Sequence, residues 1–255
     1  MTVRYDSGMA GGFSFPIHTP QRQYMVFNDF NGGQNYDADE SITLTQATSG
    51  TMAQDLTVHG GAVLFDAGAN TDGQGVNVQM GDTIVLDEAA DLFFECRVRF
   101  ATTAGTSLHQ DETFIGLAQT GTTAIVASDA MADIAFLGFS SCSTGNPTTT
   151  AGHMQLCSNV SSSGTGSGVG ATHVKIDTAA NSGVGVDDFV RLGIALRNGE
   201  AQAFVNGEKV GDPITSNLPT SLVLEPSFVC QANGTRAKYI VDYYMVTCSR
   251  SSTAL

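Results

Sequence analysis

Acidic side chains are the first candidates for chemistry, because a pair of carboxylates can hydrolyse a glycosidic bond. The densest acidic run is DEAADLFFE, residues 87–95, where Asp91, Phe93 and Glu95 would share one face of a strand. Arg97 and Arg99 continue that face, which is typical of a salt-bridged surface in water. An alternating Glu-x-Asp-x-Glu strand is absent. We therefore predict that the protein is not an enzyme and has no catalytic residue, with hydrolysis at Asp91 and Glu95 as an alternative.

Other catalytic and ligand-binding motifs are missing. The histidines are scattered, without HExxH or HxH spacing. They are His18, His59, His109, His153 and His173. A G-x-S-x-G elbow is absent. The glycines of residues 164–170 precede no Lys-Ser/Thr pair, so they form no phosphate loop. We predict no cofactor-binding residue and no metal ligand.

One segment, DAGANTDGQG at residues 66–75, superficially suggests a calcium loop. Aligning Gly73 with the invariant glycine of an EF-hand places Gly68 and Gln79 where acidic ligands are needed. A looser site made by Asp66, Asn70 and Asp72 stays open as an alternative to an Asx-rich turn.

The five cysteines form no CxxC pair and are odd in number. They are Cys96, Cys142, Cys157, Cys230 and Cys248. Cysteine is often buried as a small hydrophobic residue, so we predict thiols. A Cys142–Cys157 bridge that closes a long loop is the alternative, and it requires an oxidising compartment.

Charge and hydropathy exclude several classes of partner. The net charge is −14, and a surface this acidic repels phosphate, so we predict no direct nucleic-acid binding. No apolar run reaches the roughly 18 residues of a membrane span, which predicts no membrane partner. The first residues, MTVRYDSGMAGGFSFP, lack the apolar core of a signal peptide. We expect synthesis in a cytoplasm.

A period of two in hydrophobicity dominates the chain and predicts an all-β fold. In residues 91–100, Leu92, Phe94, Cys96, Val98 and Phe100 alternate with residues expected to face water. Residues 190–210 predict a three-stranded meander with tight turns at Asn198-Gly199 and Asn206-Gly207. Residues 238–248 form the last long strand. Further strands are expected at 24–28, 41–44, 62–65, 76–79, 83–86, 113–118, 134–139, 173–176 and 222–230.

This pattern favours an antiparallel jelly-roll β-sandwich with little helix, limited to a turn or two at residues 123–132. The predicted buried residues between the sheets are Leu92, Phe94, Val98, Leu192, Ile194, Leu196, Ile240 and Val246.

The chain divides into an N-terminal arm (residues 1–22), one sandwich domain (23–250) and a short tail (251–255). Residues 140–172 are rich in Ser, Thr and Gly and are expected to form a long excursion from the sandwich. In the arm, Phe13, Phe15 and Ile17 are apolar at alternate positions, so an extended arm presents them on one side. We predict that these three residues contact a partner.

Three segments together resemble a known family. They are LFFECRVRF; FIGLAQTGTTAIV followed by IAFLGF; and VRLGIALRNGEAQAFVNGEKVG with YIVDYYMVTC. They are similar to segments of concanavalin-A-like, laminin-G-type sandwiches encoded among the structural genes of tailed phages. The resemblance covers about residues 24–249, nearly the whole chain.

The resemblance implies a role at the virion surface. The expected function is a non-enzymatic structural protein, namely a capsid decoration, cement or minor head protein. Its partners would be the major capsid protein or other virion proteins, and the chain would form a homo-oligomer located in the virion. The alternatives are a carbohydrate-binding module for a host-surface glycan and a glycoside hydrolase. Against a sugar platform, the chain has no Trp.

Overall fold

The computed structural model describes residues 23–30, 43–47, 49–55, 58, 61–71, 73–81, 84–85, 91–100, 112–119, 134–140, 153–160, 174–177, 188–220, 222–232 and 236–249. All of its regular elements in these ranges are β-strands, and the pairs between them are antiparallel. None of the described residues forms a helix long and apolar enough to cross a membrane.

Among the described residues, the first sheet has eight strands. They are β1 (Gln23–Asn28), β3 (Thr51–Gln54), β4 (Val63–Asp66), β7 (Leu92–Phe100), β12 (Val190–Arg197), β13 (Glu200–Val205), β14 (Glu208–Ile214) and β16 (Lys238–Ser249). Their order is β14-β13-β12-β7-β16-β4-β3. The long strand β16 pairs with β4 through its first four residues and with β1 through its last six, so β1 and β4 lie end to end along it.

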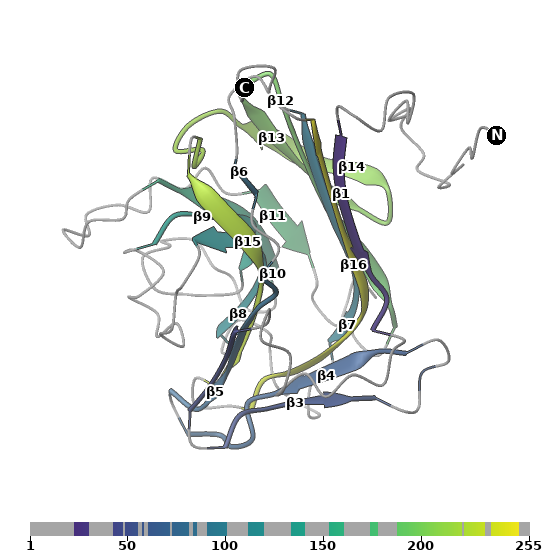
Figure 1. Ribbon diagram of the computed structural model, residues 1–255, viewed down its shortest axis with the longest axis vertical. Helices are drawn as coiled ribbons and strands as arrows, with labels where there is room; N and C mark the ends of the chain where they lie inside the picture. Colours follow the sequence, from purple (N-terminus) through teal and green to yellow (C-terminus); the bar gives the residue numbers. More distant parts are fainter. Residues whose placement is uncertain are drawn as a thin grey trace.

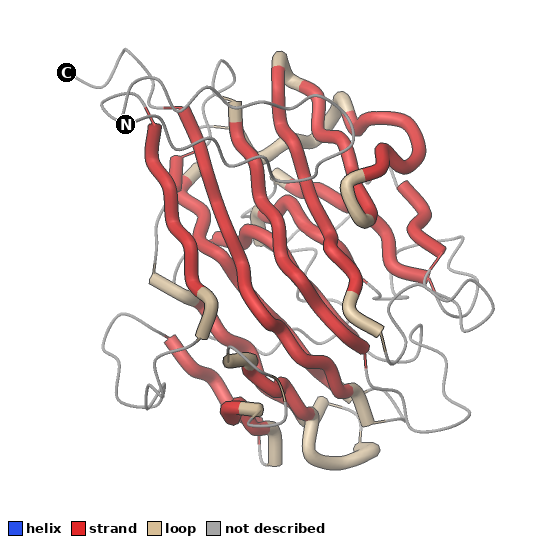
Figure 2. The backbone as a smooth tube through the Cα atoms, turned by 90° about the vertical axis from the view of Figure 1, so that its right-hand side faces the viewer, coloured by secondary structure: helices blue, strands red, loops and turns tan. Residues whose placement is uncertain are grey.

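The second sheet also has eight strands. They are β2 (Thr43–Ala47), β5 (Gly75–Gln79), β6 (Ile84–Val85), β8 (Glu112–Gln119), β9 (Phe136–Ser140), β10 (His153–Asn159), β11 (Val174–Asp177) and β15 (Val223–Gln231). Their order is β11-β10-β9-β8-β15-β5-β2, and β6 pairs with the start of β15. The two sheets face each other as two layers, and β3 and β4 lie across the lower end (Figure 1). The strands of the first sheet run side by side in Figure 2.

One continuous hydrophobic core fills the space between the sheets, which confirms the antiparallel sandwich. Seven of the eight predicted core residues belong to it and are at most 2% exposed. These are Leu92, Phe94, Val98, Leu192, Ile194, Leu196 and Val246. Its largest side chains include Tyr239 and Tyr244 of β16, and Phe65 stacks on both Tyr239 and Phe228.

Ile240 is buried but on the wrong face, and a β-bulge explains the error. The pairing of β16 with β7 shifts register between Val241 and Tyr243. Tyr239 and Val241 face the core before the shift, and Tyr244 and Val246 face it afterwards. Because the bulge inserts one residue, strict alternation counted backwards from Val246 assigns Ile240 to the core incorrectly.

The sequence predicted that the side of β7 away from the core faces water, and the structure differs from this. Phe93 is 3% exposed and Glu95 6% exposed, although both point away from the core. Phe93 packs in a second cluster with Ala195 and Phe204, against which Met245 lies. This side of β7 is therefore buried over half its length.

Both predicted tight hairpins are confirmed. Asn198 and Gly199 have φ angles of 53° and 74°, and Asn206 and Gly207 have 52° and 85°. Two successive positive φ angles are the property of a type I′ turn, which matches the twist of the flanking strands.

Residues 140–172 include a strand that the sequence pattern did not predict. Strand β10 pairs with β9 on one side and β11 on the other, so this part belongs to the second sheet instead of an excursion. Strand β3 was also not predicted. The expected arm (1–22), the expected helical turn (123–132) and the tail (251–255) lie outside the described residues.

Candidate functional site

The predicted partner-contact residues Phe13, Phe15 and Ile17 lie outside the described residues, so they stay a prediction. The structure does place most of the other candidates, and it also shows two outer faces with unusual chemistry.

The alternative catalytic pair, Asp91 and Glu95, has no catalytic geometry. Asp91 forms an exposed ion pair with Arg197 at 3.5 Å. Glu95 is buried and accepts a hydrogen bond from the hydroxyl of Tyr243, with 2.6 Å between the oxygens. Four residues of extended chain separate the Cα atoms of Asp91 and Glu95 by about 13 Å, at about 3.3 Å per residue, and each carboxyl is held by a different partner. Glycosidases hold theirs about 5 to 9.5 Å apart.

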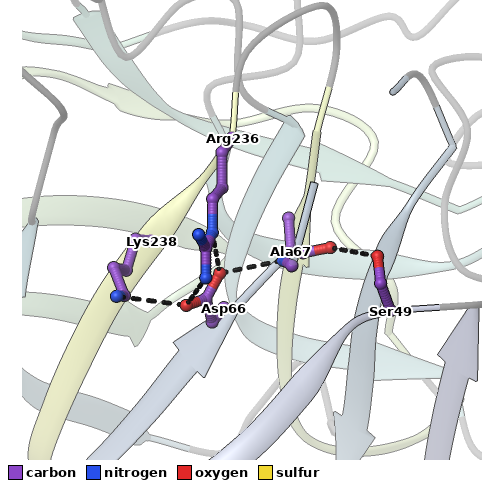
Figure 3. A network of polar contacts seen from close by, with 6 residues as sticks. Ser49, Asp66, Ala67, Arg236 and Lys238 are labelled. Atoms are coloured by element: carbon purple, nitrogen blue, oxygen red, sulfur yellow. Dashed lines mark hydrogen bonds and ion pairs between the residues drawn. The ribbon is translucent and has the colours of Figure 1, made fainter. Parts of the chain in front are cut away.

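Asp66 lies in a network of ion pairs at the end of the sandwich (Figure 3). The guanidinium of Arg236 donates two hydrogen bonds of 2.6 Å to its two carboxylate oxygens. The ammonium of Lys238 lies 3.1 Å from Oδ2, and the Gly68 N–H donates to Oδ1 at 2.8 Å. Burial raises the pKa of the Asp66 carboxyl, but the bonds from Arg236, Gly68 and Lys238 outweigh it, and the pKa is below its ordinary value.

This network contradicts the calcium alternative for residues 66–75. The Asp66 side chain is 5% exposed and is already neutralised by two cations. Asn70 is exposed, and Asp72 lies outside the described residues. In the described part of the chain no three His, Cys, Asp or Glu side chains gather where they could hold a metal ion. The segment instead forms an Asx-type turn, in which Asp66 bonds the N–H two residues on.

The described cysteines agree with the prediction of thiols. Cys96, Cys157 and Cys230 are buried thiols and Cys248 is a half-buried one. Burial raises the pKa of the Cys96 thiol well above its ordinary value, so this group is not a nucleophile. Cys142 lies outside the described residues, so the alternative bridge between Cys142 and Cys157 stays a prediction.

The outer face of the second sheet carries buried polar side chains on β5 and β15. Gln79 Nε2 donates to the Gln119 carbonyl at 2.9 Å and to Ser227 Oγ at 3.3 Å. Gln79 and Gln231 are each 1% exposed. The Oε1 atoms of both accept no hydrogen bond from any residue that the structure describes. Leaving a buried carbonyl oxygen without a hydrogen-bond donor is costly.

The same face is apolar towards β8, β9 and β10. Phe114, Phe136, Cys157 and Val229 form a buried cluster, with Phe114 and Phe136 in edge-to-face contact at 5.6 Å. Gly138 lies under the Phe114 ring, since a Cβ there would be 2.5 Å from Phe114 Cε2. Of the side chains described on this face, Glu225 alone is a carboxylate, and it accepts a bond from the Gly81 N–H. A carboxylate pair is therefore absent among them.

The outer face of the first sheet carries an exposed apolar patch beside β1. Met25 and Phe27 are each 53% exposed, whereas Val26 between them packs on the core. The ring of Phe27 lies 5.7 Å from that of Tyr243, and Phe27 is opposite Met245 in the strand register. We call these four residues, Met25, Phe27, Tyr243 and Met245, the β1 patch.

The β1 patch borders the buried cluster of Phe93, Ala195 and Phe204 on β7, β12 and β13. Met245 joins the two, because it belongs to the patch and packs against that cluster. In the β1 patch, burial and the hydrogen bond to Glu95 raise the pKa of the Tyr243 hydroxyl above its ordinary value. The hydroxyl thus stays protonated and holds the Glu95 carboxylate in place. Arg97 and Arg99 border this region, both over the ring of Phe189 at 4.3 and 5.1 Å.

Sequence reasoning missed both faces. The alternation in MVF, residues 25–27, was visible, but either side of the strand could have faced the core. The sequence GVNVQ, residues 75–79, also contains polar residues at alternate positions. Polar residues on a strand normally predict a face exposed to solvent. Only the assembled sheets show which side is buried.

Comparisons with known proteins establish the fold. No family model and no curated protein matches the sequence. Peanut lectin superimposes with a TM-score of 0.63 at 12% identity, over 90% of this chain and 100% of its own. A GH16 enzyme of Bacteroides ovatus acting on mixed-linkage glucan gives a TM-score of 0.56 at 9% identity, over 87% and 99%.

The fold is that of the concanavalin-A-like lectins and glucanases. An endo-β-1,3-glucanase of Pyrococcus furiosus has the same architecture, with a TM-score of 0.56 at 10% identity over 89% of this chain and 94% of its own. The part of the family resemblance that concerns the concanavalin-A-like jelly roll is thus confirmed. The neighbours include both binding proteins and enzymes, so at these identities they establish the architecture alone.

Proposed function

We propose that this concanavalin-A-like sandwich is a non-enzymatic structural protein of a tailed-phage particle. It would be made in the host cytoplasm and bound at the particle surface as a capsid decoration or minor head protein. The major capsid protein or another virion protein would be its partner, and copies of the chain would associate with one another.

The observation that carries this proposal is the β1 patch. Met25 and Phe27 each expose 53% of their surface on a regular strand, next to Tyr243 and Met245. Contiguous exposed apolar side chains on a folded domain mark sites of protein contact. The full-length resemblance to phage structural sandwiches supports the same role.

The test is the composition of the particle. Particles purified from a culture that expresses the gene at its native locus are washed at high salt and analysed by mass spectrometry. We expect this chain in a fixed ratio to the major capsid protein, and a lower ratio for Phe27→Gln. Particles that lack the chain refute the proposal.

A second function, binding of a host-surface glycan, is favoured by a different observation. Gln79 Oε1 and Gln231 Oε1 are buried on the second sheet's outer face without a donor among the described residues. A sugar supplies many hydroxyl donors, and buried acceptors that lack a partner discriminate strongly for such a ligand. Lectins among the structural neighbours support this alternative, since one of them is the basic winged bean lectin with Tn-antigen.

A glycan array probed with the labelled protein tests this alternative. We expect binding that Gln231→Ala abolishes. Gln202→Ala serves as the control, because Gln202 lies on the outer face of the other sheet and also has a carbonyl oxygen without a partner among the described residues. A blank array, or equal loss in both variants, rejects the glycan function.

A further inference from the structure

Strand β1 forms a border of the first sheet beside the last six residues of β16. Among the described residues, β1 pairs with β16 alone. Its outward side chains, Met25 and Phe27, are each 53% exposed. A strand at the edge of a sheet presents a row of N–H and C=O groups to any further strand. The chemistry of this edge therefore determines what can bind to it.

The backbone of β16 shows which peptide groups of β1 face the free edge. The N–H of Ser249 donates to the carbonyl of Asp91 at 2.8 Å, on the side of β7. Peptide groups alternate in direction along an antiparallel strand, so the even-numbered residues at this end of β16 direct theirs to β1. Val26 is opposite an even-numbered residue and directs its own groups to β16. Met25 and Phe27 therefore direct their N–H and C=O groups to the free edge.

Strand β1 lacks the features that keep a sheet edge from pairing. Charged side chains, proline and bulges on an edge strand oppose pairing with another chain. Strand β14, the opposite border of the same sheet, has all three. Its sequence EKVGDPI contains three charges and a proline, and its pairing with β13 shifts register. The sequence of β1, QYMVFN, has no charge and no proline, and its register is regular. The edge of β1 is therefore suited to receive a strand.

A second copy of β1 complements this edge. Antiparallel pairing about a two-fold axis at Val26 places Met25 of each copy opposite Phe27 of the other. Both residues direct their N–H and C=O groups into the contact, so each such pair exchanges two hydrogen bonds. On the outer face, the thioether of Met25 meets the ring of Phe27, which is a favourable contact.

Charge also favours β1 as the place where copies meet. The net charge of each chain is −14, so two copies repel each other over most of their surfaces. Strand β1 carries no charge, and Asp29, which follows it, is opposite Gln23 of the other copy in this register. The paired strands thus place no carboxylate opposite another.

We infer that two copies of the chain pair through β1, so that their first sheets join into one sheet across a two-fold axis. This inference rests on the proposed assembly function and names the contact between the copies. It covers Met25 and Phe27 of both copies and gives hydrogen-bond partners to the peptide groups at both free edges.

Charge variants of the full chain, studied by analytical ultracentrifugation, test this pairing. Met25→Lys/Phe27→Lys places lysine opposite lysine in the two-fold register, and Met25→Glu/Phe27→Glu places glutamate opposite glutamate. We expect the wild type to dimerise and each variant alone to dimerise about tenfold more weakly or worse. An equal mixture of the two variants should restore dimers with one copy of each, because lysine is then opposite glutamate.

The matched control is Val160→Lys/Val223→Lys. Both valines are 42% exposed and lie outside β1, so this variant adds the same charge elsewhere. It should dimerise like the wild type, and circular dichroism checks that each variant is folded. The inference is overturned by a monomeric wild type, by a lysine variant of β1 that dimerises as tightly as the wild type, by an equal loss in the control, or by a mixture without mixed dimers.

Amide exchange in the wild type gives a second readout that needs no variant. Among the described residues, nothing accepts a hydrogen bond from the N–H groups of Met25 and Phe27. These two amides should exchange freely in dilute protein and become protected at concentrations where dimers form. Dimers in which both amides still exchange freely would show that the copies meet elsewhere.

The outcome is separable from that of the particle experiment. Dimers can form in purified protein even if particles lack the chain, in which case only the virion proposal fails. Particles that contain the chain, together with a monomeric wild type, refute the dimer alone. If Met25→Lys/Phe27→Lys is then lost from the particles, the edge of β1 binds a strand of another virion protein instead of a second copy.

Discussion

Replacing Asp66 with asparagine tests whether the ion pairs at the end of the sandwich stabilise the fold. The amide keeps the size of the side chain and an oxygen for the Gly68 N–H, but it removes the charge that Arg236 and Lys238 share. Breaking a buried ion pair costs about 3–5 kcal/mol. An exposed pair contributes about 0–1 kcal/mol.

The expected magnitude lies between these limits. Asp66 is 5% exposed, but the side chains of Arg236 and Lys238 are 42% and 36% exposed and regain water when the carboxylate is lost. We expect Asp66→Asn to lower the free energy of unfolding at pH 7 by about 2–3 kcal/mol.

The effect should depend on pH in a defined direction. The pKa of Asp66 in the folded protein is below the ordinary value of 3.8. A carboxyl with a lowered folded-state pKa stabilises the protein above its unfolded-state pKa, and the contribution disappears as the pH falls through the folded-state pKa. The difference between wild type and Asp66→Asn should thus be full at pH 7 and shrink steadily below about pH 4.

Urea unfolding followed by circular dichroism at pH 7, 5, 4 and 3 measures both effects. Asp91→Asn is the control, because the pair of Asp91 with Arg197 is 3.5 Å long and its side chains are 42% and 61% exposed. We expect the control to change stability by about 0.5 kcal/mol or less. If Asp66→Asn costs nothing at pH 7, or the same amount at every pH, the charge of Asp66 does not stabilise the fold through Arg236 and Lys238.

Three further predictions concern the core and the turns. Ile194→Ala should lower the free energy of unfolding by about 2–5 kcal/mol, since Ile194 is fully buried between the sheets, and an unchanged melting temperature would refute its placement. Gly68→Ala should be far more destabilising than Gly73→Ala in the same unfolding assay. Both have positive φ angles, but a Cβ at Gly68 would be 1.9 Å from the carbonyl oxygen of Ser49, and one at Gly73 meets nothing within 4 Å, so equal losses would contradict the structure. Gly199→Val should destabilise the β12–β13 hairpin by more than 1 kcal/mol, whereas Asn198→Asp should be close to neutral, and amide exchange in β12 and β13 distinguishes the two.

The sequence determined most of the architecture because alternation is a local property. Leu92, Phe94 and Val98 repeat every second residue, and a strand with that pattern buries one side wherever it lies in a sheet. The turns at Asn198-Gly199 and Asn206-Gly207 were predictable for the same reason, since the two residues set their own φ angles.

Only the tertiary structure determines which residues are buried on the outer faces of the two sheets. Alternating hydrophobicity indicates that the two sides of a strand differ. It does not indicate that Phe93 and Gln79 are both buried on the sides away from the core. The bulge after Val241 inserts a residue that no local pattern reveals, and it moved Ile240 to the other face. Asp66 meets Arg236 across 170 residues of sequence only because β4 pairs with β16, a register set by the packing of both sheets. Asp66, the first residue of the calcium-like segment and the last of β4, therefore pairs with two cations, Arg236 and Lys238.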